Sequence, residues 1–187
     1  MPEEKLQQGF GLGGHLIFGF GAALHNRHFS TLVGSCTADA SVRQAWWCII
    51  LLVNVRELID NGRCFVCGPD NPAGFRMKFS TKDDMTIARF TPGCLFQGYE
   101  GIVHGGILAT VMDEAMAQHL LAQDYRILTV SMEVRFRAPA DPEEELEVRA
   151  WETSRRGRLF HCESRITTAG VVVVADCKGV YIGPPAD

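Results

Sequence analysis

The chain has 187 residues, of which 47% are hydrophobic and 21% are charged, as expected for a globular protein with one well-formed core. Its net charge of -4 at pH 7, with no basic cluster interleaved with aromatic residues, argues against nucleic acid as a partner. The seven cysteines are scattered and no secretory leader pattern opens the chain, so we expect a reduced, cytoplasmic compartment.

Residues 1–57 differ in composition from the rest, and we expect them to form an N-terminal extension. Their glycines would weaken a helix and lack the spacing of a phosphate-binding loop. The apolar run from Ala45 to Val53 is about half as long as a membrane-spanning helix, so no stable membrane insertion is expected. The extension is either poorly ordered, a product of an upstream start codon, or a functional region whose role the sequence does not define.

Regular elements are expected from Asn61 onward. The turn-rich stretch CFVCGPDNPAG leads to a first strand, and a helix is expected from Gly106 to Gln123, with Ile107, Val111, Ala115 and Leu121 near one face. Alternating apolar and polar residues predict the other strands, and short turns make consecutive antiparallel pairing the simplest topology. The strands are expected at 75–79, 85–90, 129–136, 145–153, 158–168 and 171–182. The fold class is therefore α+β, with one long central helix packed on an antiparallel sheet of five to six strands.

The pair Gly105 and Gly106 lies where the helix is expected to start. Unpaired amides of a first helical turn point outward with the positive end of the helix dipole behind them, which suits a developing oxyanion. The other interpretation is that the two glycines only permit a tight turn.

Asp113 and Glu114 lie in an apolar part of the same helix. A carboxylate is costly to bury without a purpose. Successive side chains point about 100° apart, so we assign Asp113 to a site and Glu114 to the surface or a structural pair. Gly106 lies roughly 10 Å from Asp113 along one helix. If both act on one substrate, they must therefore come from two subunits of a symmetric dimer.

Three stretches resemble the hotdog-fold thioesterase superfamily, and within it the phenylacetate-pathway-like subgroup. They are CFVCGPDNPAGFRMKF, GIVHGGILATVMDEAM and TVSMEVRFRAPA, and the resemblance covers about residues 60–182. It implies a hotdog domain over residues 58–187, with the sheet wrapped around the helix. It also implies hydrolysis of acyl-CoA to free acid and coenzyme A, without a cofactor, by a homodimer that can pair further into a homotetramer.

The resemblance also implies roles for individual residues. Asp113 would attack the thioester carbonyl or activate a water molecule for that attack. Gly106, with Gly105 close by, would supply the amide that polarises the carbonyl oxygen. Thr129 occupies the position of a Ser or Thr that helps to position the water, and Gln97 is the nearest candidate for an assisting side chain in the preceding loop.

Other polar residues are assigned to substrate binding or to the surroundings of the site. In the family, the equivalent of His104 is more often a positioning residue of the turn than a general base. Glu114, next to Asp113, is also assigned to substrate binding. Arg135 and Arg137 could contact the phosphates of coenzyme A, or could belong to a solvated face.

Cys64 and Cys67 form a CxxC pair, but no second pair follows at the spacing of a zinc ribbon. We therefore expect no metal site, and expect the pair to shape a loop. A thioredoxin-like role is disfavoured because Gly68 and Pro69 follow the pair, where a helix would have to begin.

Two alternative functions stay open. A hotdog dehydratase or hydratase needs a histidine in the loop where this chain has Tyr99. A non-catalytic acyl-CoA-binding module would keep the pocket without turnover. The sequence does not define the acyl group.

Overall fold

A computed structural model describes Val55 and residues 58–169 and 171–184. The predicted N-terminal extension, residues 1–57, lies outside the described residues except for Val55. Within the described part of the chain, no helix is long and apolar enough to cross a membrane.

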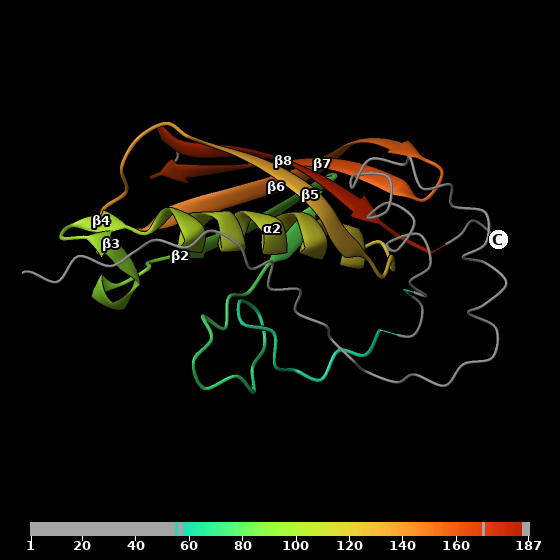
Figure 1. Cartoon of the computed structure of the whole chain (residues 1–187), viewed down its shortest axis with the longest axis horizontal. Helices are drawn as coiled ribbons and strands as arrows, with labels where there is room; N and C mark the ends of the chain where they lie inside the picture. The colour runs from blue at the N-terminus through green and yellow to red at the C-terminus, as the bar shows by residue number, and fades with distance from the viewer. Residues whose placement is uncertain (1–54, 56–57, 170, 185–187) are drawn as a thin grey trace, which may run out of the picture. The chain divides into compact units, whose positions relative to one another are not determined.

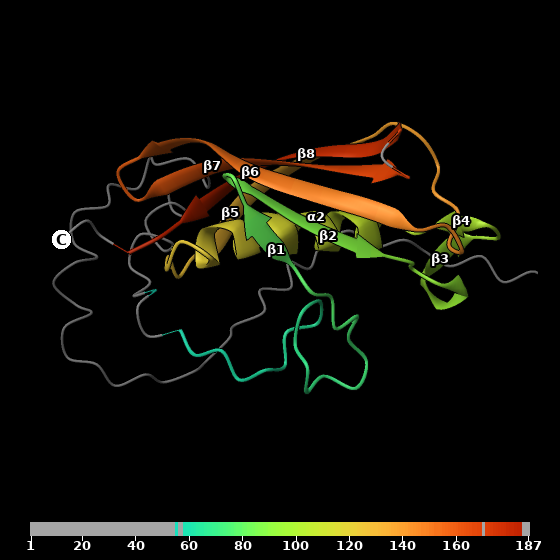
Figure 2. The same ribbon diagram turned by 180° about the vertical axis from the view of Figure 1, so that it is seen from behind.

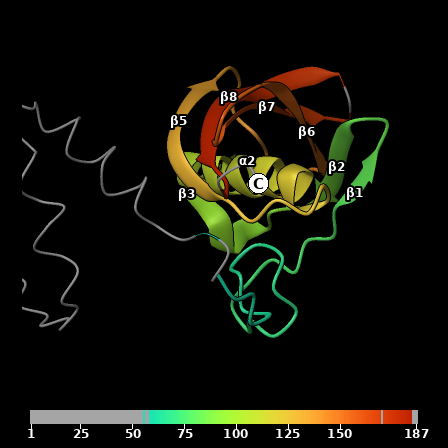
Figure 3. The same ribbon diagram turned by 90° about the vertical axis from the view of Figure 1, so that its right-hand side faces the viewer.

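A six-stranded antiparallel sheet and one long helix form the domain (Figure 1). The helix, α2, runs from Gly105 to Leu121, and a short hairpin of β3 (Gln97–Tyr99) and β4 (Ile102–Val103) leads into it. The strands of the large sheet are β1 (Ser80–Lys82), β2 (Met85–Phe90), β5 (Leu128–Phe136), β6 (Leu146–Arg156), β7 (Leu159–Thr168) and β8 (Val172–Ile182). Seen nearly along the helix, the sheet curves around α2 (Figure 3). The predicted α+β architecture is confirmed.

The strands lie in the order β1-β2-β6-β7-β8-β5, with β1 and β2 at one edge (Figure 2). The prediction of consecutive pairing is correct for β6, β7 and β8 but wrong for β5, which pairs with β8 instead of β6. Tight turns force β6, β7 and β8 to be neighbours, whereas the longer segment 137–145 lets the chain pass from the β5 edge to the middle of the sheet.

The first strand was predicted at 75–79, which is wrong, because β1 begins only at Ser80. The backbone of this segment binds the preceding loop instead of the sheet. Phe75 donates its N–H to the Phe65 carbonyl at 3.0 Å, and Met77 donates to the Val66 carbonyl at 2.8 Å. The alternating pattern indicated an extended segment correctly but could not indicate its partner.

The core lies between α2 and the inner face of the sheet. The helix residues Leu108, Val111, Met112, Ala115, Met116 and Leu120 are each at most 3% exposed. Burial of one such Leu or Met side chain stabilises the fold by about 1.5–3 kcal/mol. Of the predicted apolar face, Val111 and Ala115 are buried, whereas Leu121 is 41% exposed. The buried face of α2 is therefore rotated slightly about the helix axis from the predicted face.

Candidate active site

Asp113 lies in the middle of α2. Its side chain is half-buried where β5 begins and β8 ends. Its Oδ1 accepts hydrogen bonds from the Tyr181 phenol at 2.8 Å and from the Thr129 hydroxyl at 3.0 Å. Its Oδ2 has a single longer contact, 3.3 Å to the same threonine. Burial and the charge of Asp113 raise the pKa of Tyr181 well above its ordinary value, so the phenol stays protonated and donates.

Thr129 reaches Asp113 because β5 contains a bulge. Thr129 pairs with Tyr181 and Ser131 pairs with Val180, so two steps along β5 match one step along β8. The extra residue is Val130. Regular alternation would place Thr129 on the same face as Ser131, away from the helix, whereas the bulge turns it inward. The bulge in β5 thus places the Thr129 hydroxyl beside the Tyr181 hydroxyl at Asp113.

An open pocket of about 590 Å³ lies beside Asp113. Asp113, Glu114 and Thr129 line it together with apolar side chains such as Ala117 and Leu121. The structure therefore brings both adjacent carboxylates to one cavity. A pocket with polar groups at one side and apolar groups at the other suits a ligand that has a polar reacting centre and an apolar tail.

Glu114 contacts the CxxC loop. Its Oε2 accepts from the Cys64 thiol at 3.3 Å, and its Oε1 accepts from the Gln118 side-chain amide at 2.8 Å. The same Gln118 nitrogen lies 3.3 Å from the Cys67 sulfur. Burial and Glu114 raise the pKa of Cys67 far above its ordinary value. Glu114 thus forms the structural pair that was one of the two predicted alternatives for it.

The start of α2 presents two glycine amides in different states. His104 caps the helix, and its Nδ1 accepts the Gly106 N–H at 2.9 Å. The Gly105 N–H has no hydrogen-bond partner among the described residues. The free amide at the helix start is therefore that of Gly105, whereas the sequence had favoured Gly106.

Gln97 organises the loop before the helix. Its amide nitrogen donates to the Cys94 carbonyl at 2.8 Å, and its Oε1 accepts the Gly101 N–H at 2.6 Å. Both ends of the side-chain amide are therefore engaged within the loop. In addition, Gln97, His104 and Gly106 line a separate open pocket of about 470 Å³.

The helix start and Asp113 line different pockets of one chain. A further open pocket of about 470 Å³, lined by His104, Gly105 and Phe136 among others, also lies at the helix start. Neither this pocket nor the one lined by Gln97 shares a lining residue with the pocket beside Asp113. Eight residues of helix separate Gly105 from Asp113, a distance of about 12 Å along the axis. A single thioester group cannot contact both residues within one chain.

Arg135 and Arg137 lie on the outer face of the sheet in local ion pairs. Arg135 binds Glu133 at 2.7 Å, and Arg137 binds Asp176 at 3.0 Å. Arg165 binds the same Asp176 at 2.7 Å. This arrangement fits the solvated-face interpretation for Arg135, whereas Arg137 also lines the open pocket that contains Gly105.

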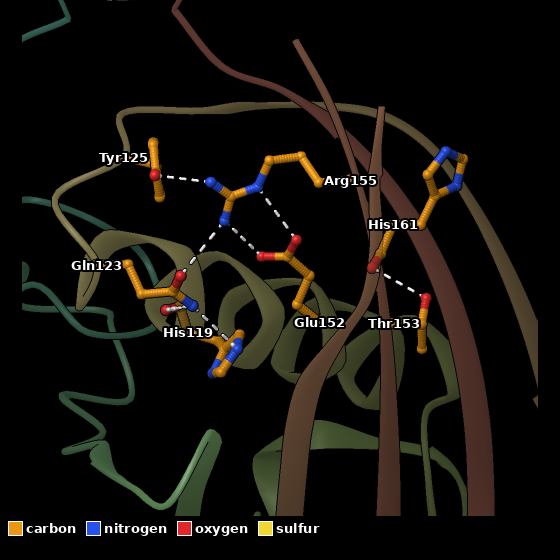
Figure 4. A network of polar contacts seen from close by, with 7 residues as sticks. All are labelled: His119, Gln123, Tyr125, Glu152, Thr153, Arg155 and His161. Atoms are coloured by element: carbon orange, nitrogen blue, oxygen red, sulfur yellow. Dashed lines mark hydrogen bonds and ion pairs between the residues drawn. The ribbon is translucent and has the colours of Figure 1, made fainter. Parts of the chain in front are cut away.

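A second polar cluster closes the far end of α2 (Figure 4). Arg155 forms an ion pair with Glu152 at 2.8 Å, donates to the Tyr125 hydroxyl at 2.6 Å and lies over the Tyr125 ring. It also lies 3.4 Å from the Gln123 side-chain oxygen, and Gln123 contacts the ring of His119 at 3.2 Å. Since Tyr125 lines the pocket beside Asp113, this cluster supports one wall of that pocket.

Residues 100–175 match the family model of the Thioesterase superfamily. This part of the chain is therefore similar to that superfamily. A thioesterase superfamily protein of known crystal structure has the same fold, with a TM-score of 0.61 and 23% identity over 64% of this chain and 63% of that chain. The chain thus spans less than two thirds of that protein's length. No curated protein matches the chain.

Two further solved structures are similar to this chain in fold. A hypothetical thioesterase from Streptococcus pneumoniae TIGR4, solved with coenzyme A, has a TM-score of 0.55 and 13% identity over 58% of this chain and 89% of that chain. A phenylacetic acid degradation-related protein from Ralstonia eutropha JMP134 has a TM-score of 0.53 and 18% identity over 57% of this chain and 84% of that chain. The predicted hotdog fold is confirmed.

Tyr181 is the candidate site residue that the sequence did not reveal. It lies in β8, 68 residues from Asp113, and is completely buried. From the sequence alone, a tyrosine in an expected strand is interpreted as a core residue. Only the pairing of β8 with β5, which the sequence did not predict, places its hydroxyl beside Thr129.

Proposed function

We propose that this domain hydrolyses acyl-CoA thioesters to free acid and coenzyme A, with Asp113 as the catalytic carboxylate. The observation that carries the proposal is the setting of Asp113. Its carboxylate is half-buried at an open pocket, is held by two hydroxyl groups, and forms no ion pair with any described residue. A structural role would favour a basic partner, since burying an unpaired carboxylate is costly.

The chemistry follows from how the two carboxylate oxygens are used. Thr129 and Tyr181 hold Oδ1, which leaves Oδ2 as the more available oxygen. In one route, Oδ2 attacks the thioester carbonyl, the thiolate of coenzyme A leaves and takes a proton from water, and a further water molecule hydrolyses the resulting mixed anhydride. In the other route, Oδ2 takes a proton from a water molecule that attacks the carbonyl directly, and then passes this proton to the departing thiolate of coenzyme A. Both routes need the same fixed carboxylate.

The free Gly105 amide would polarise the carbonyl oxygen as charge develops on it. Because one chain keeps Gly105 and Asp113 apart, the proposal requires the amide of one subunit and the carboxylate of its partner. Strand β5 lies at a sheet edge and pairs only with β8 among the described strands, so it is available to pair with a second copy. A homodimer through β5 would continue the sheet from one subunit to the other.

The solved structures support the substrate class. The Streptococcus pneumoniae neighbour carries coenzyme A in its crystal structure, and we transfer coenzyme A thioesters to this chain as the proposed substrates. The assisting role of Gln97 in the reaction, the substrate-binding role of His104 and a cytoplasmic location stay predictions.

The test is thiol release from short, long and aromatic acyl-CoAs by the wild type and by Asp113→Asn. We expect turnover of at least one substrate and a fall of about two orders of magnitude in the variant, the scale of a lost acid–base group. Glu133→Gln makes the same chemical change on the outer face of β5 and should keep wild-type activity. Binding of acyl-CoA without thiol release in the wild type would contradict the proposal and favour the binding-module alternative.

A further inference from the structure

The CxxC loop and helix α2 bring three metal-binding side chains together outside the proposed reaction centre. The Cys64 sulfur, the Cys67 sulfur and a Glu114 carboxylate oxygen all lie within 4.8 Å of one another, and all three residues are half-buried. Cys64 and Glu114 are 50 residues apart in the sequence. Only the packing of the loop on the helix forms the cluster.

The loop itself has the shape of a metal-binding knuckle. The Val66 N–H points at the Cys64 sulfur at 3.4 Å, and the Gly68 N–H donates to the Cys64 carbonyl at 3.0 Å. This turn places both sulfur atoms on one side of the loop. Residue 68 must be glycine there, because a Cβ atom would collide with the backbone of Cys64.

Backbone hydrogen bonds of the surrounding chain hold the loop in this shape. Phe65 and Val66 accept from Phe75 and Met77, and Gly62 accepts from the Asp70 N–H at 3.0 Å. The loop that presents the two sulfur atoms to Glu114 is therefore held by its own hydrogen bonds, which lowers the ordering cost of binding an ion.

We propose that Cys64, Cys67 and Glu114 bind a zinc ion, with a water molecule from the adjoining pocket as the fourth ligand. Zinc–sulfur bonds of about 2.3 Å in a tetrahedron put two sulfur atoms roughly 3.8 Å apart. The cluster needs to contract by at most about 1 Å to reach this geometry. Binding releases the two thiol protons, and two thiolates and a carboxylate are ligands that zinc accepts.

The other described cysteines lack this setting. Cys94 is exposed, and its thiol contacts a carboxylate, Glu143 at 3.0 Å, without a second sulfur nearby. Burial raises the pKa of Cys162 to about 12 and that of Cys177 to about 11, so both stay inert thiols in the core. Cys94 with Glu143 is thus a natural control, since it has the same thiol-to-carboxylate contact.

The zinc ion would tie the loop to α2 at the residue next to Asp113. Both the loop and Asp113 line the pocket of about 590 Å³, so the ion would hold one wall of that pocket in place. The sequence argued against a metal because no second CxxC pair follows the first. The structure supplies the third ligand from the helix instead.

The test is the zinc content of the full-length chain, purified under reducing conditions from zinc-supplemented cells, together with titration by Co²⁺. We expect one zinc per chain and a cobalt–thiolate absorption band. Cys64→Ser and Cys67→Ser should abolish both. Glu114→Gln, which keeps the side-chain size, should weaken cobalt binding at least about tenfold, the scale of losing even an outer-shell partner.

Cys94→Ser should leave the zinc content and the cobalt band unchanged. The proposal is overturned if the wild type holds no zinc and shows no cobalt–thiolate band. It is equally overturned if Cys94→Ser loses as much metal as Cys64→Ser, or if mass spectrometry finds Cys64 and Cys67 joined in a disulfide under the same reducing conditions. None of these readouts depends on thioesterase activity.

Discussion

The carboxylate of Asp113 depends on two hydroxyl groups from neighbouring strands. Tyr181 and Thr129 face each other across β8 and β5, and both donate to Oδ1. Among the described residues, no buried side-chain nitrogen or oxygen lacks a hydrogen-bond partner. The buried Tyr181 hydroxyl has Asp113 as its partner. Removing one hydroxyl should change how firmly the carboxylate is held without moving the helix.

We expect Tyr181→Phe and Thr129→Val each to lower kcat for acyl-CoA hydrolysis by about ten- to a hundredfold with little change in KM. The reason is the loss of a hydrogen bond to a charged group, worth about 1.5–3 kcal/mol. Tyr99→Phe removes a hydroxyl from a side chain that is 79% exposed and should be neutral. Unchanged kcat in both site variants would show that the hydroxyl pair serves the fold alone.

The Gly105 amide can be removed by a single substitution with a matched control. Gly105→Pro deletes the N–H at the first position of α2, where a helix tolerates proline, and the extended backbone of His104 suits the residue before a proline. Gly105→Ala keeps the N–H and makes the same contact, since any Cβ there lies 3.0 Å from the Phe136 ring.

We expect kcat to fall by about a hundredfold or more in Gly105→Pro relative to Gly105→Ala, the scale of losing one oxyanion donor. The measurement is thiol release by both variants under identical conditions. Equal kcat values in the two variants would remove Gly105 from the reaction and leave Gly106 as the donor to examine.

Most helices and strands could be predicted from local patterns, whereas strand pairing could be predicted only for β6, β7 and β8. Periodicity located β2, α2 and the long strands, because one face of each is buried. It could not reveal the bulge at Val130, since one extra residue leaves no mark in an alternating pattern. It also missed the β3–β4 hairpin, which is short and held by Gln97 rather than by an apolar face.

The cluster at the end of α2 makes His119 a buried neutral base. Gln123 donates to His119 Nε2, which leaves Nδ1 to donate to the Thr86 hydroxyl at 3.2 Å. Burial lowers the pKa of His119 below its ordinary value of 6.5, while the nearby charges of Glu152 and Asp84 oppose that shift. Arg155 adds a positive charge to the same cluster by way of Gln123.

A lowered pKa in the folded state means that the unfolded chain binds the proton more readily. The stability that neutral His119 contributes is complete above about pH 6.5 and is lost as the pH falls through the lower folded pKa. We expect Tm to fall below pH 6.5 in the wild type, and to fall less steeply in His119→Gln. His161→Gln should keep the wild-type slope, and equal slopes in all three proteins would contradict the assignment.

At the scale of the whole molecule, the site residues divide into two groups that one chain keeps apart. The sequence predicted this separation from helix geometry alone, because a distance along one helix needs no tertiary information. Tyr181, in contrast, and the approach of Glu114 to the cysteines depend on contacts between distant segments. Such contacts follow from the sheet order, which local patterns do not encode.

The proposed reaction centre is shared by two subunits. The most direct test joins two variants in one dimer, Asp113→Asn in one subunit and Gly105→Pro in the other, co-expressed with different tags and purified through both. Each homodimer should be nearly inactive. The mixed dimer has one site with both defects and one site with neither, so we expect about half of the wild-type rate per dimer. A mixed dimer as inactive as its two parents would contradict the shared site.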